Sequence, residues 1–210
     1  MQILLVAATA MEIDPFLKQN PAVDHLITGV GTPATIYQLT RRLHQIDYDL
    51  VIQAGIAGSF AGSAGLAEIV LVAEDCFADL GISEKNNFYT IFEKGFAGED
   101  VFPFANGWLK ADAEILNGFS VPKLRAITVN TVTDEKNKIE ALVSKFDPQI
   151  ETMEGAALHY VCLQEHIPFL QLRSISNYVG ERDKTKWKMK EAIEQLNKAL
   201  AELIAGLTSH

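Results

Sequence analysis

The sequence predicts an α/β fold, a three-layer αβα sandwich with a central mixed twisted sheet, and three observations support this prediction. Short apolar runs rich in β-branched residues alternate along the chain with amphipathic stretches of helical spacing. The apolar runs lack strict polar alternation, which is typical of strands covered on both faces. The 210 residues are 48% hydrophobic, enough for a sizeable core, so we expect one domain over residues 1–210.

The apolar runs are the expected strands, and the expected helices lie between them. Strands are predicted over 3–8, 25–31, 50–58, 68–74, 124–132 and 167–176. Apolar residues at helical spacing predict helices over 32–46, 134–146, 155–166 and 185–207. Residues 75–118 are aromatic-rich, broken by Gly and Pro, and without a clean period. Two interpretations fit this segment. It forms either a meandering strand pair with its own small aromatic core or a lid over a flat apolar ligand.

Charge and composition limit the partners. The net charge of -9 argues against nucleic acid and anionic membranes, since both require clustered Lys and Arg, and favours a small-molecule ligand. Residues 1–16 have no basic start and only a strand-length apolar run, so we expect neither a signal peptide nor a membrane span, and a cytoplasmic protein. Cys76 and Cys162 are expected to be buried free thiols.

Two glycine-rich stretches follow predicted strands. Residues 29–34, GVGTPA, match the dinucleotide fingerprint GxGxxA at a strand-to-helix junction. The acidic residue expected at the end of the next strand is missing, since Gln53 and Ala54 stand there, which argues against an NAD site. The second stretch, 54–59, fits either a ligand-facing backbone or a tight packed turn.

Carboxylates at strand ends are the strongest functional signal. The stretch 151–162, ETMEGAALHYVC, places two acids before a helix predicted to be buried. Helix capping explains one of them, because an acid near a helix N-terminus gains up to about 1 kcal/mol. Glu12 and Asn177 also follow strands, and ligand sites in open α/β sheets lie beyond the carboxyl ends of the strands. We therefore expect Glu12, the Gly55 loop, Glu154 and Asn177 to converge on one crevice.

The order ATAMEID, TGVGTPAT, VIQAGIAG, ETMEGAALHYVC, RSISN and a long C-terminal helix resembles the purine nucleoside phosphorylase and nucleosidase superfamily along essentially the whole chain. Within it, RSISNYVGERDKTKW resembles the futalosine hydrolases, which release hypoxanthine from futalosine in an alternative menaquinone pathway. The resemblance implies a cofactor-free N-ribosyl hydrolase with an oxocarbenium-like transition state, in a homo-oligomer, dimer or higher.

The resemblance also implies roles for particular residues. Glu12 activates a water at C1', and Arg173 contacts that water and Glu12. Glu154, with Met153 beside the sugar, holds the ribose and favours its developing positive charge. The Asn177 amide accepts a hydrogen bond from a protonated N7 and donates one to a 6-oxo group, which favours hypoxanthine over adenine. The remaining substrate-binding positions are Ile56, Ala57, Gly58, Val132 and Arg182.

Some features depart from the resemblance or leave alternatives. Ile56 stands where the methylthioadenosine nucleosidases have a serine, so one polar contact is lost. The loops 7–14 and 54–63 have no Lys or Arg to hold phosphate, which favours hydrolysis over phosphorolysis. Arg182 is the candidate partner for the carboxylate of the substrate's tail. The alternative is that Arg182 and Asp183 pair with each other and cap the last helix. The aromatic candidates for the tail pocket are Phe88, Tyr89, Phe92 and Phe104.

Other functions stay open at this point. One is a nucleosidase of the same fold acting on methylthioadenosine, adenosylhomocysteine or aminofutalosine. Another is a nucleoside-binding domain without turnover, against which the intact pair of Glu12 and Glu154 argues. The histidines show no ligand spacing, so we expect no metal; they are His25, His44, His159, His166 and His210.

Overall fold

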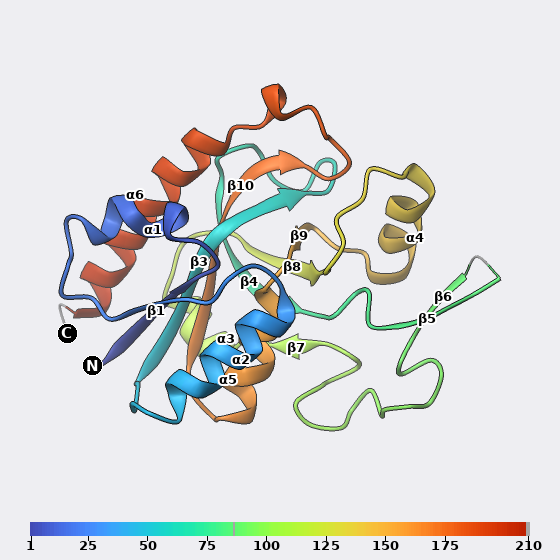
Figure 1. Cartoon of the computed structure of the whole chain (residues 1–210), viewed down its shortest axis with the longest axis horizontal. Helices are drawn as coiled ribbons and strands as arrows, with labels where there is room; N and C mark the ends of the chain where they lie inside the picture. Colours follow the sequence, from blue (N-terminus) through green and yellow to red (C-terminus); the bar gives the residue numbers. More distant parts are fainter. Residues whose placement is uncertain (86, 209–210) are drawn as a thin grey trace.

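The computed structural model describes residues 1–85 and 87–208, which form a mixed sheet between helices (Figure 1). Its eight strands run in the order β10-β4-β8-β9-β3-β1-β2, with β7 on β4 and an additional pairing of β10 with β3. Their bounds are β1 Ile3–Ala7, β2 His25–Ile27, β3 Leu50–Ser59, β4 Ile69–Asp75, β7 Leu109–Lys110, β8 Lys123–Thr128, β9 Ile150–Thr152 and β10 Phe169–Tyr178. Each predicted strand is present, so the mixed sheet is confirmed.

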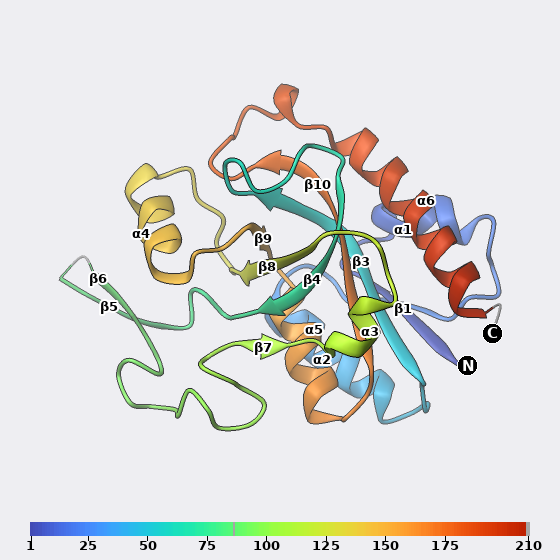
Figure 2. The same cartoon turned by 180° about the vertical axis from the view of Figure 1, so that it is seen from behind.

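Helices cover both faces of this sheet, as the three-layer prediction requires. One layer holds α1 and α6, which contact each other and strand β3, and the opposite layer holds α2 and α5 (Figures 1 and 2). The helices are α1 Ala10–Leu17, α2 Thr32–Leu43, α3 Ala113–Asn117, α4 Lys136–Phe146, α5 Gly155–Gln164 and α6 Met189–Thr208, with a 3-10 turn at Lys184–Lys186. No helix within the described ranges is both long and apolar enough to cross a membrane.

Strand β1 illustrates why continuous apolar runs predicted doubly covered strands. Leu5 and Ala7 belong to the core beneath α1 and α6, whereas Leu4 and Val6 belong to the core beneath α2 and α5. All four side chains are 0% exposed. Because successive side chains of a strand point to opposite faces, a strand with apolar residues at every position needs a cover on both sides.

The sheet closes on itself, a feature that the prediction of a central mixed twisted sheet does not include. Strand β10 is parallel to β3 along most of its length and antiparallel to β4, while β9 joins β8 to β3. The five strands β3, β10, β4, β8 and β9 therefore form a ring. Its interior is apolar and consists of Ala57, Val70, Val72, Leu124, Ala126, Ile150 and Ile175. Strand β9 has three residues, too few for a periodicity to reveal it.

The segment 75–118 contains the predicted strand pair. Strands β5 (Gly81–Glu84) and β6 (Asn87–Thr90) form a hairpin that extends away from the main sheet (Figure 2). Phe92 and Phe104 stack edge to face at 5.1 Å between ring centroids, and Phe104 also lies 6.1 Å from the ring of Tyr160 on α5. These aromatics form the expected satellite core. Phe96, in contrast, is 69% exposed.

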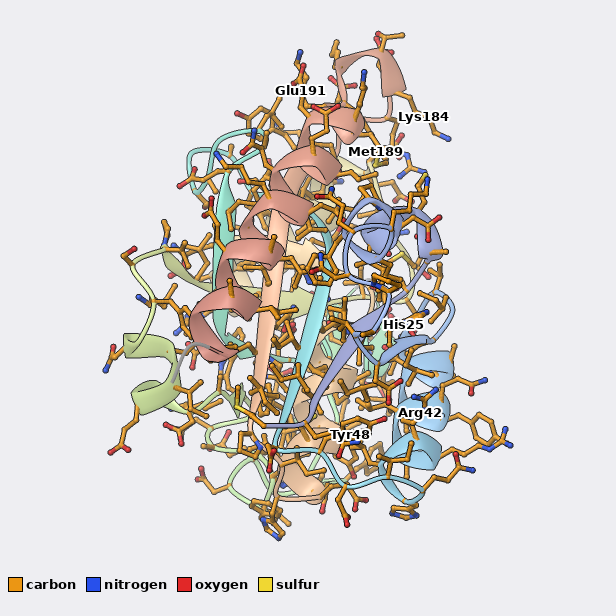
Figure 3. The ribbon with its side chains drawn as sticks, turned by 90° about the vertical axis from the view of Figure 1, so that its left-hand side faces the viewer. His25, Arg42, Tyr48, Lys184, Met189 and Glu191 are labelled. Atoms are coloured by element: carbon orange, nitrogen blue, oxygen red, sulfur yellow. The ribbon has the colours of Figure 1, made fainter. Side chains whose placement is uncertain are left out.

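A polar cluster anchors the far end of helix α2. Arg42 donates from Nη1 to Asp24 Oδ1 at 2.9 Å and to the Tyr48 hydroxyl at 3.3 Å. Tyr48 in turn donates to Asp24. Figure 3 shows Arg42 and Tyr48 at the C-terminal end of α2, well away from Met189 at the start of α6. The cluster fixes the helix whose N-terminus faces the site described next.

Candidate active site

A cavity of about 240 Å³ opens at the carboxyl ends of β1, β3 and β10. Residues from distant parts of the chain line it: Ala8, Thr9, Met11, Glu12, Val30, Ile56, Ala57, Gly58, Val132, Thr133, Glu151, Thr152, Met153, Glu154, Ser176, Asn177, Val179, Gly180, Glu181, Arg182 and Trp187. The predicted catalytic and substrate-binding residues are in this lining, except Arg173 and the four aromatics proposed for the tail pocket. Thr9, Thr133, Glu151 and Ser176 are lining residues that the sequence did not single out as substrate contacts.

Glu12 is held rigidly at the edge of the cavity. It is 6% exposed, and its Oε2 accepts hydrogen bonds from the Thr9 backbone N–H at 2.9 Å and the Thr9 hydroxyl at 3.0 Å. Its Oε1 accepts from the Ile56 backbone N–H at 3.2 Å. Thr9 and Glu12 form the capping box of α1, a T-x-x-E signal that could have predicted this helix. The carboxylate therefore has one fixed orientation between β1 and β3.

Arg173 lies behind the cavity and is not among its lining residues, so its predicted contact with the attacking water stays a prediction. It is 1% exposed and donates from Nη2 to Gln53 Oε1, while its Nε has no hydrogen-bond partner among the described residues. A Cβ on Gly55 would lie 2.2 Å from Arg173 Nη1 and 2.9 Å from Glu12 Oε1. The missing side chain of Gly55 thus lets the guanidinium approach Glu12 from inside the fold.

Glu154 precedes helix α5 and links it to helix α2. Its Oε1 accepts a hydrogen bond from the Gly31 backbone N–H at 2.9 Å. Burial raises the pKa of this carboxyl, opposed by the positive charge of Arg173 and by the Gly31 hydrogen bond. The anion at the start of α2 is therefore a protein carboxylate, so the N–H group that a pyrophosphate would need in the GVGTPA fingerprint is already bound.

Asn177 closes the opposite side of the cavity at the end of β10. Its Oδ1 accepts from the Ser176 hydroxyl at 2.8 Å, and its Nδ2 donates to the Tyr178 carbonyl at 3.1 Å. These bonds fix the amide orientation and leave one N–H and one oxygen lone pair for a ligand.

The cavity lining is strongly acidic. Four of the lining residues are glutamates, Glu12, Glu151, Glu154 and Glu181, and the one lining cation within the described part of the chain is Arg182. Glu181 is paired with Lys186 at 2.7 Å. Because a phosphate dianion needs several cationic partners, this surface disfavours phosphate and suits a ligand with hydroxyl and N–H donors.

The structure separates the residues proposed for the substrate tail. Arg182 lines the cavity, and Asp183 instead caps the turn Lys184–Lys186 by accepting from the Thr185 backbone N–H. None of Phe88, Tyr89, Phe92 and Phe104 is in the cavity lining. Phe92 and Phe104 pack in the satellite core, and Tyr89 lies under the Lys94 ammonium group. Within this chain the four aromatics are therefore not part of the site.

Neither metal-ligand clusters nor reactive thiols occur in the described ranges. No group of three or more His, Cys, Asp and Glu side chains there could hold a metal ion. Cys76 and Cys162 are buried free cysteines, as predicted. His210 lies outside the described residues. His159 is fully buried on α5, and its Nδ1 contacts the Leu109 carbonyl at 3.0 Å.

A buried carboxyl beneath the site should make stability depend on pH. Burial raises the pKa of Asp75 to about 7, against hydrogen bonds from Thr128 and Gln171 that lower it. An unfolded Asp titrates near 3.9, so the stabilising proton is present at low pH and lost as pH rises through about 7. The free energy of unfolding is expected to fall from about pH 6.5 to 8, and to fall less in Asp75→Asn. Denaturant titrations at both pH values measure the difference.

Glu151 also titrates between about pH 6.5 and 8, whereas His159, whose effect on stability is opposite, does not. Burial also raises the pKa of Glu151 to about 7, so part of the pH dependence should remain in Asp75→Asn. Burial lowers the pKa of His159 to about 4, which destabilises the fold only below the ordinary histidine pKa of about 6.5. Equal pH dependence in the wild type and Asp75→Asn would show that Asp75 does not titrate in this window.

Comparisons with known proteins place the chain in a family. Residues 25–208 match the family model described as the Phosphorylase superfamily, and the chain belongs to this superfamily. A solved structure, the native futalosine hydrolase of Helicobacter pylori strain 26695, superposes with a TM-score of 0.79 over 97% of each chain, at 17% identity. This structural similarity confirms the fold. At 17% identity it supports no statement beyond the fold.

Sequence relatives narrow the family further. A futalosine hydrolase of Thermus thermophilus is 29% identical, with 96% of this chain and 95% of the relative covered. One of Acidothermus cellulolyticus is 30% identical over 90% of this chain and 78% of the relative. A 5'-methylthioadenosine/S-adenosylhomocysteine nucleosidase of Bacillus cereus is 27% identical over 74% and 68%. Within the superfamily, the chain belongs to the futalosine hydrolase family.

Proposed function

We propose that this protein is a futalosine hydrolase, an N-glycosyl hydrolase that cleaves futalosine to hypoxanthine and dehypoxanthine futalosine in the alternative menaquinone pathway. The observation that carries the proposal is the meeting of Glu12, Glu154 and Asn177 in one cavity. These three groups correspond to the needs of ribosyl transfer to water: a base for the nucleophile, a grip on the sugar and a partner for the leaving purine.

The chemistry begins at Glu12. A water positioned against this carboxylate attacks C1' of the ribose as the C1'–N9 bond breaks, and its proton passes to Glu12. The three donors on Glu12 hold the carboxylate in place before substrate arrives. Arg173, behind Gly55, acts as a positioning residue for Glu12.

The remaining groups act on the two fragments. Glu154 accepts hydrogen bonds from the ribose hydroxyls and favours positive charge on the sugar, with Met153 beside it. The purine leaves with the electron pair of the C1'–N9 bond and takes a proton at N7 from solvent water, and Asn177 accepts from N7–H through Oδ1 and donates from Nδ2 to the 6-oxo group. Ile56, Ala57, Gly58 and Val132 provide the contact surface, and Arg182 the partner for the carboxylate of the tail.

Water is the proposed nucleophile because the lining carboxylates disfavour phosphate. We further propose one nucleosidase domain over residues 1–210, a cytoplasmic location and a homo-oligomer, dimer or higher. No cofactor, nucleic-acid or membrane partner is part of the proposal. The alternatives are a methylthioadenosine, adenosylhomocysteine or aminofutalosine nucleosidase of the same fold and a nucleoside-binding domain without turnover.

The deciding experiment offers the purified protein futalosine, aminofutalosine and methylthioadenosine, each with and without phosphate, and follows free purine by chromatography. Hypoxanthine released from futalosine alone, at a rate independent of phosphate, supports the proposal. Adenine release identifies a sister nucleosidase, and ligand binding without base release identifies a non-catalytic domain.

Asn177→Asp should shift the base preference toward 6-amino purines. An aspartic acid can donate a proton at N7 and accept from a 6-amino group, which an amide cannot do with the same atoms. The ratio of kcat/KM for aminofutalosine to that for futalosine is expected to rise by about 10- to 100-fold, because one buried hydrogen-bonding group without a partner typically costs a factor of this size. An unchanged ratio would remove Asn177 from base recognition.

A further inference from the structure

The burial of Glu151 is not explained by any hydrogen bond or ion pair within residues 1–85 and 87–208. The side chain is 8% exposed and lines the cavity, and its Oε2 has no hydrogen-bond partner among the described residues. A buried carboxyl group without partners costs several kcal/mol unless something compensates for it. The compensation is therefore to be sought in a ligand that occupies the cavity.

Helix capping does not account for this side chain. Helix α5 begins at Gly155 with Glu154 as its N-cap residue, whereas Glu151 lies in strand β9. Burial raises the pKa of the Glu151 carboxyl, the positive charge of Arg182 opposes this, and the negative charge of Asp79 adds to it. In the described part of the chain, neither Arg182 nor any other cation lies within ion-pair distance of Glu151.

The strand register places Glu151 opposite Asn177. Glu151 on β9 pairs with Gly58 on β3, and Gly58 pairs on its other side with Asn177 on β10. Directly paired residues point to the same face of a sheet, and a Cβ on Gly58 would lie 3.4 Å from Asn177 Nδ2. The Cα atoms of Glu151 and Asn177 are thus two strand spacings apart, roughly 9 to 10 Å. The backbone of Gly58 and the side chain of Val179 lie between them, since a Cβ on Gly58 would lie 3.2 Å from Val179 Cγ2, and a flat ring in the cavity can rest on this apolar surface.

We propose that Glu151 accepts a hydrogen bond from N1–H of a 6-oxopurine and, with Asn177, reads the edge of the base. This inference rests on the proposed function and adds a specificity-determining residue to it. Above the pKa of about 7 that burial gives Glu151, the ionised carboxylate only accepts hydrogen bonds, so it pairs with the N1–H of hypoxanthine, and the binding test is made at about pH 8. The N1 of adenine is itself an acceptor, and the same carboxylate repels it. Glu151 and Asn177 therefore select the 6-oxo pattern from two sides of Gly58.

The test combines a change in the ligand with a change in the protein. Calorimetry measures the affinities of hypoxanthine and 1-methylhypoxanthine, which lacks the N1 donor, for the wild type and for Glu151→Leu. The wild type is expected to bind hypoxanthine about 10- to 100-fold more tightly than its 1-methyl derivative. Glu151→Leu is expected to lose this discrimination and to bind 1-methylhypoxanthine as the wild type does, within about threefold.

A second variant and a matched control complete the experiment. Glu151→Gln supplies an amide N–H for the N1 of adenine and should raise adenine affinity about tenfold. Glu135→Gln changes an exposed carboxylate outside the cavity lining, one paired with Lys138 at 2.7 Å, and should leave all three affinities unchanged. Since both Glu151 variants remove an unpartnered buried carboxyl, their thermal stability should equal or exceed that of the wild type.

The outcomes separate this inference from the proposed function. Discrimination against 1-methylhypoxanthine that persists in Glu151→Leu overturns the role of Glu151, even if futalosine is hydrolysed. Loss of discrimination in Glu151→Leu, with raised adenine affinity in Glu151→Gln and neither change in Glu135→Gln, supports it, whichever nucleoside is the best substrate. A wild type that binds no purine base overturns the role of Glu151, whereas the release of hypoxanthine from futalosine decides the proposed function separately.

Discussion

Replacing Glu12 by glutamine is expected to lower kcat by about 10²- to 10⁴-fold while leaving substrate binding nearly unchanged. The amide is nearly isosteric, but it cannot accept the proton of the attacking water, and general-base catalysis contributes a factor of this size. Single-turnover measurement of purine release gives the rate, and equilibrium binding of futalosine to the variant gives the affinity.

Glutamine is also the substitution that best preserves the fold. Glu12 closes the capping box with Thr9, and Gln serves in the same motif, so helix α1 should persist. A thermal unfolding temperature close to that of the wild type would exclude a collapsed site as the cause of the lost rate. Turnover within about threefold of the wild type would remove Glu12 as the base and leave it as a helix-capping residue.

Gly155→Ala is expected to have the largest effect on stability. A Cβ at this position would lie 2.1 Å from Gln171 Nε2 and 2.2 Å from Asp75 Oδ2. These two side chains are 0% exposed and hydrogen-bonded to each other at 3.3 Å, so neither can move aside freely. Overpacking costs about 1 to 3 kcal/mol, and breaking the buried bond adds a similar amount. The free energy of unfolding should fall by about 2 to 5 kcal/mol in denaturant titrations.

Gly206→Ala is the matched control for this prediction. Gly206 lies in helix α6, and a Cβ there meets nothing within 4 Å. An alanine is compatible with the helix and restricts the unfolded chain, so stability should stay the same or rise by up to about 1 kcal/mol. If the two variants were equally stable, the close packing of Gly155 against Asp75 and Gln171 would be contradicted.

Much of the site could be anticipated because strand ends are visible in the sequence. Glu12, Ile56 and Asn177 each follow an apolar run, and the carboxyl ends of β1, β3 and β10 open on the same cavity. These strands pair in parallel, so their carboxyl ends lie at the same edge of the sheet and the residues that follow them lie close together. Their chemical roles stay proposals, since the fold brings the residues together without setting the reaction.

Other features depended on packing that leaves no local signal. Arg173 belongs to the same strand as Asn177, yet its side chain lies behind Gly55, because only a bare backbone there admits the guanidinium. The aromatics of 75–118 stayed out of the cavity because several of them pack on one another and on α5. In the sequence, Glu151 is hard to tell from an acid that caps the following helix.

The sequence by itself determined the alternating strands and helices, the doubly covered sheet and the family, since these follow from local periodicity and from motifs of neighbouring residues. Only the tertiary structure decided the closure of the β3-β10-β4-β8-β9 ring, and with it the register that sets Glu151 across Gly58 from Asn177. Register arises from pairings between residues far apart in the chain, and a shift of one residue turns every side chain to the other face. No local pattern encodes that choice; the packing of the whole apolar interior of the ring sets it.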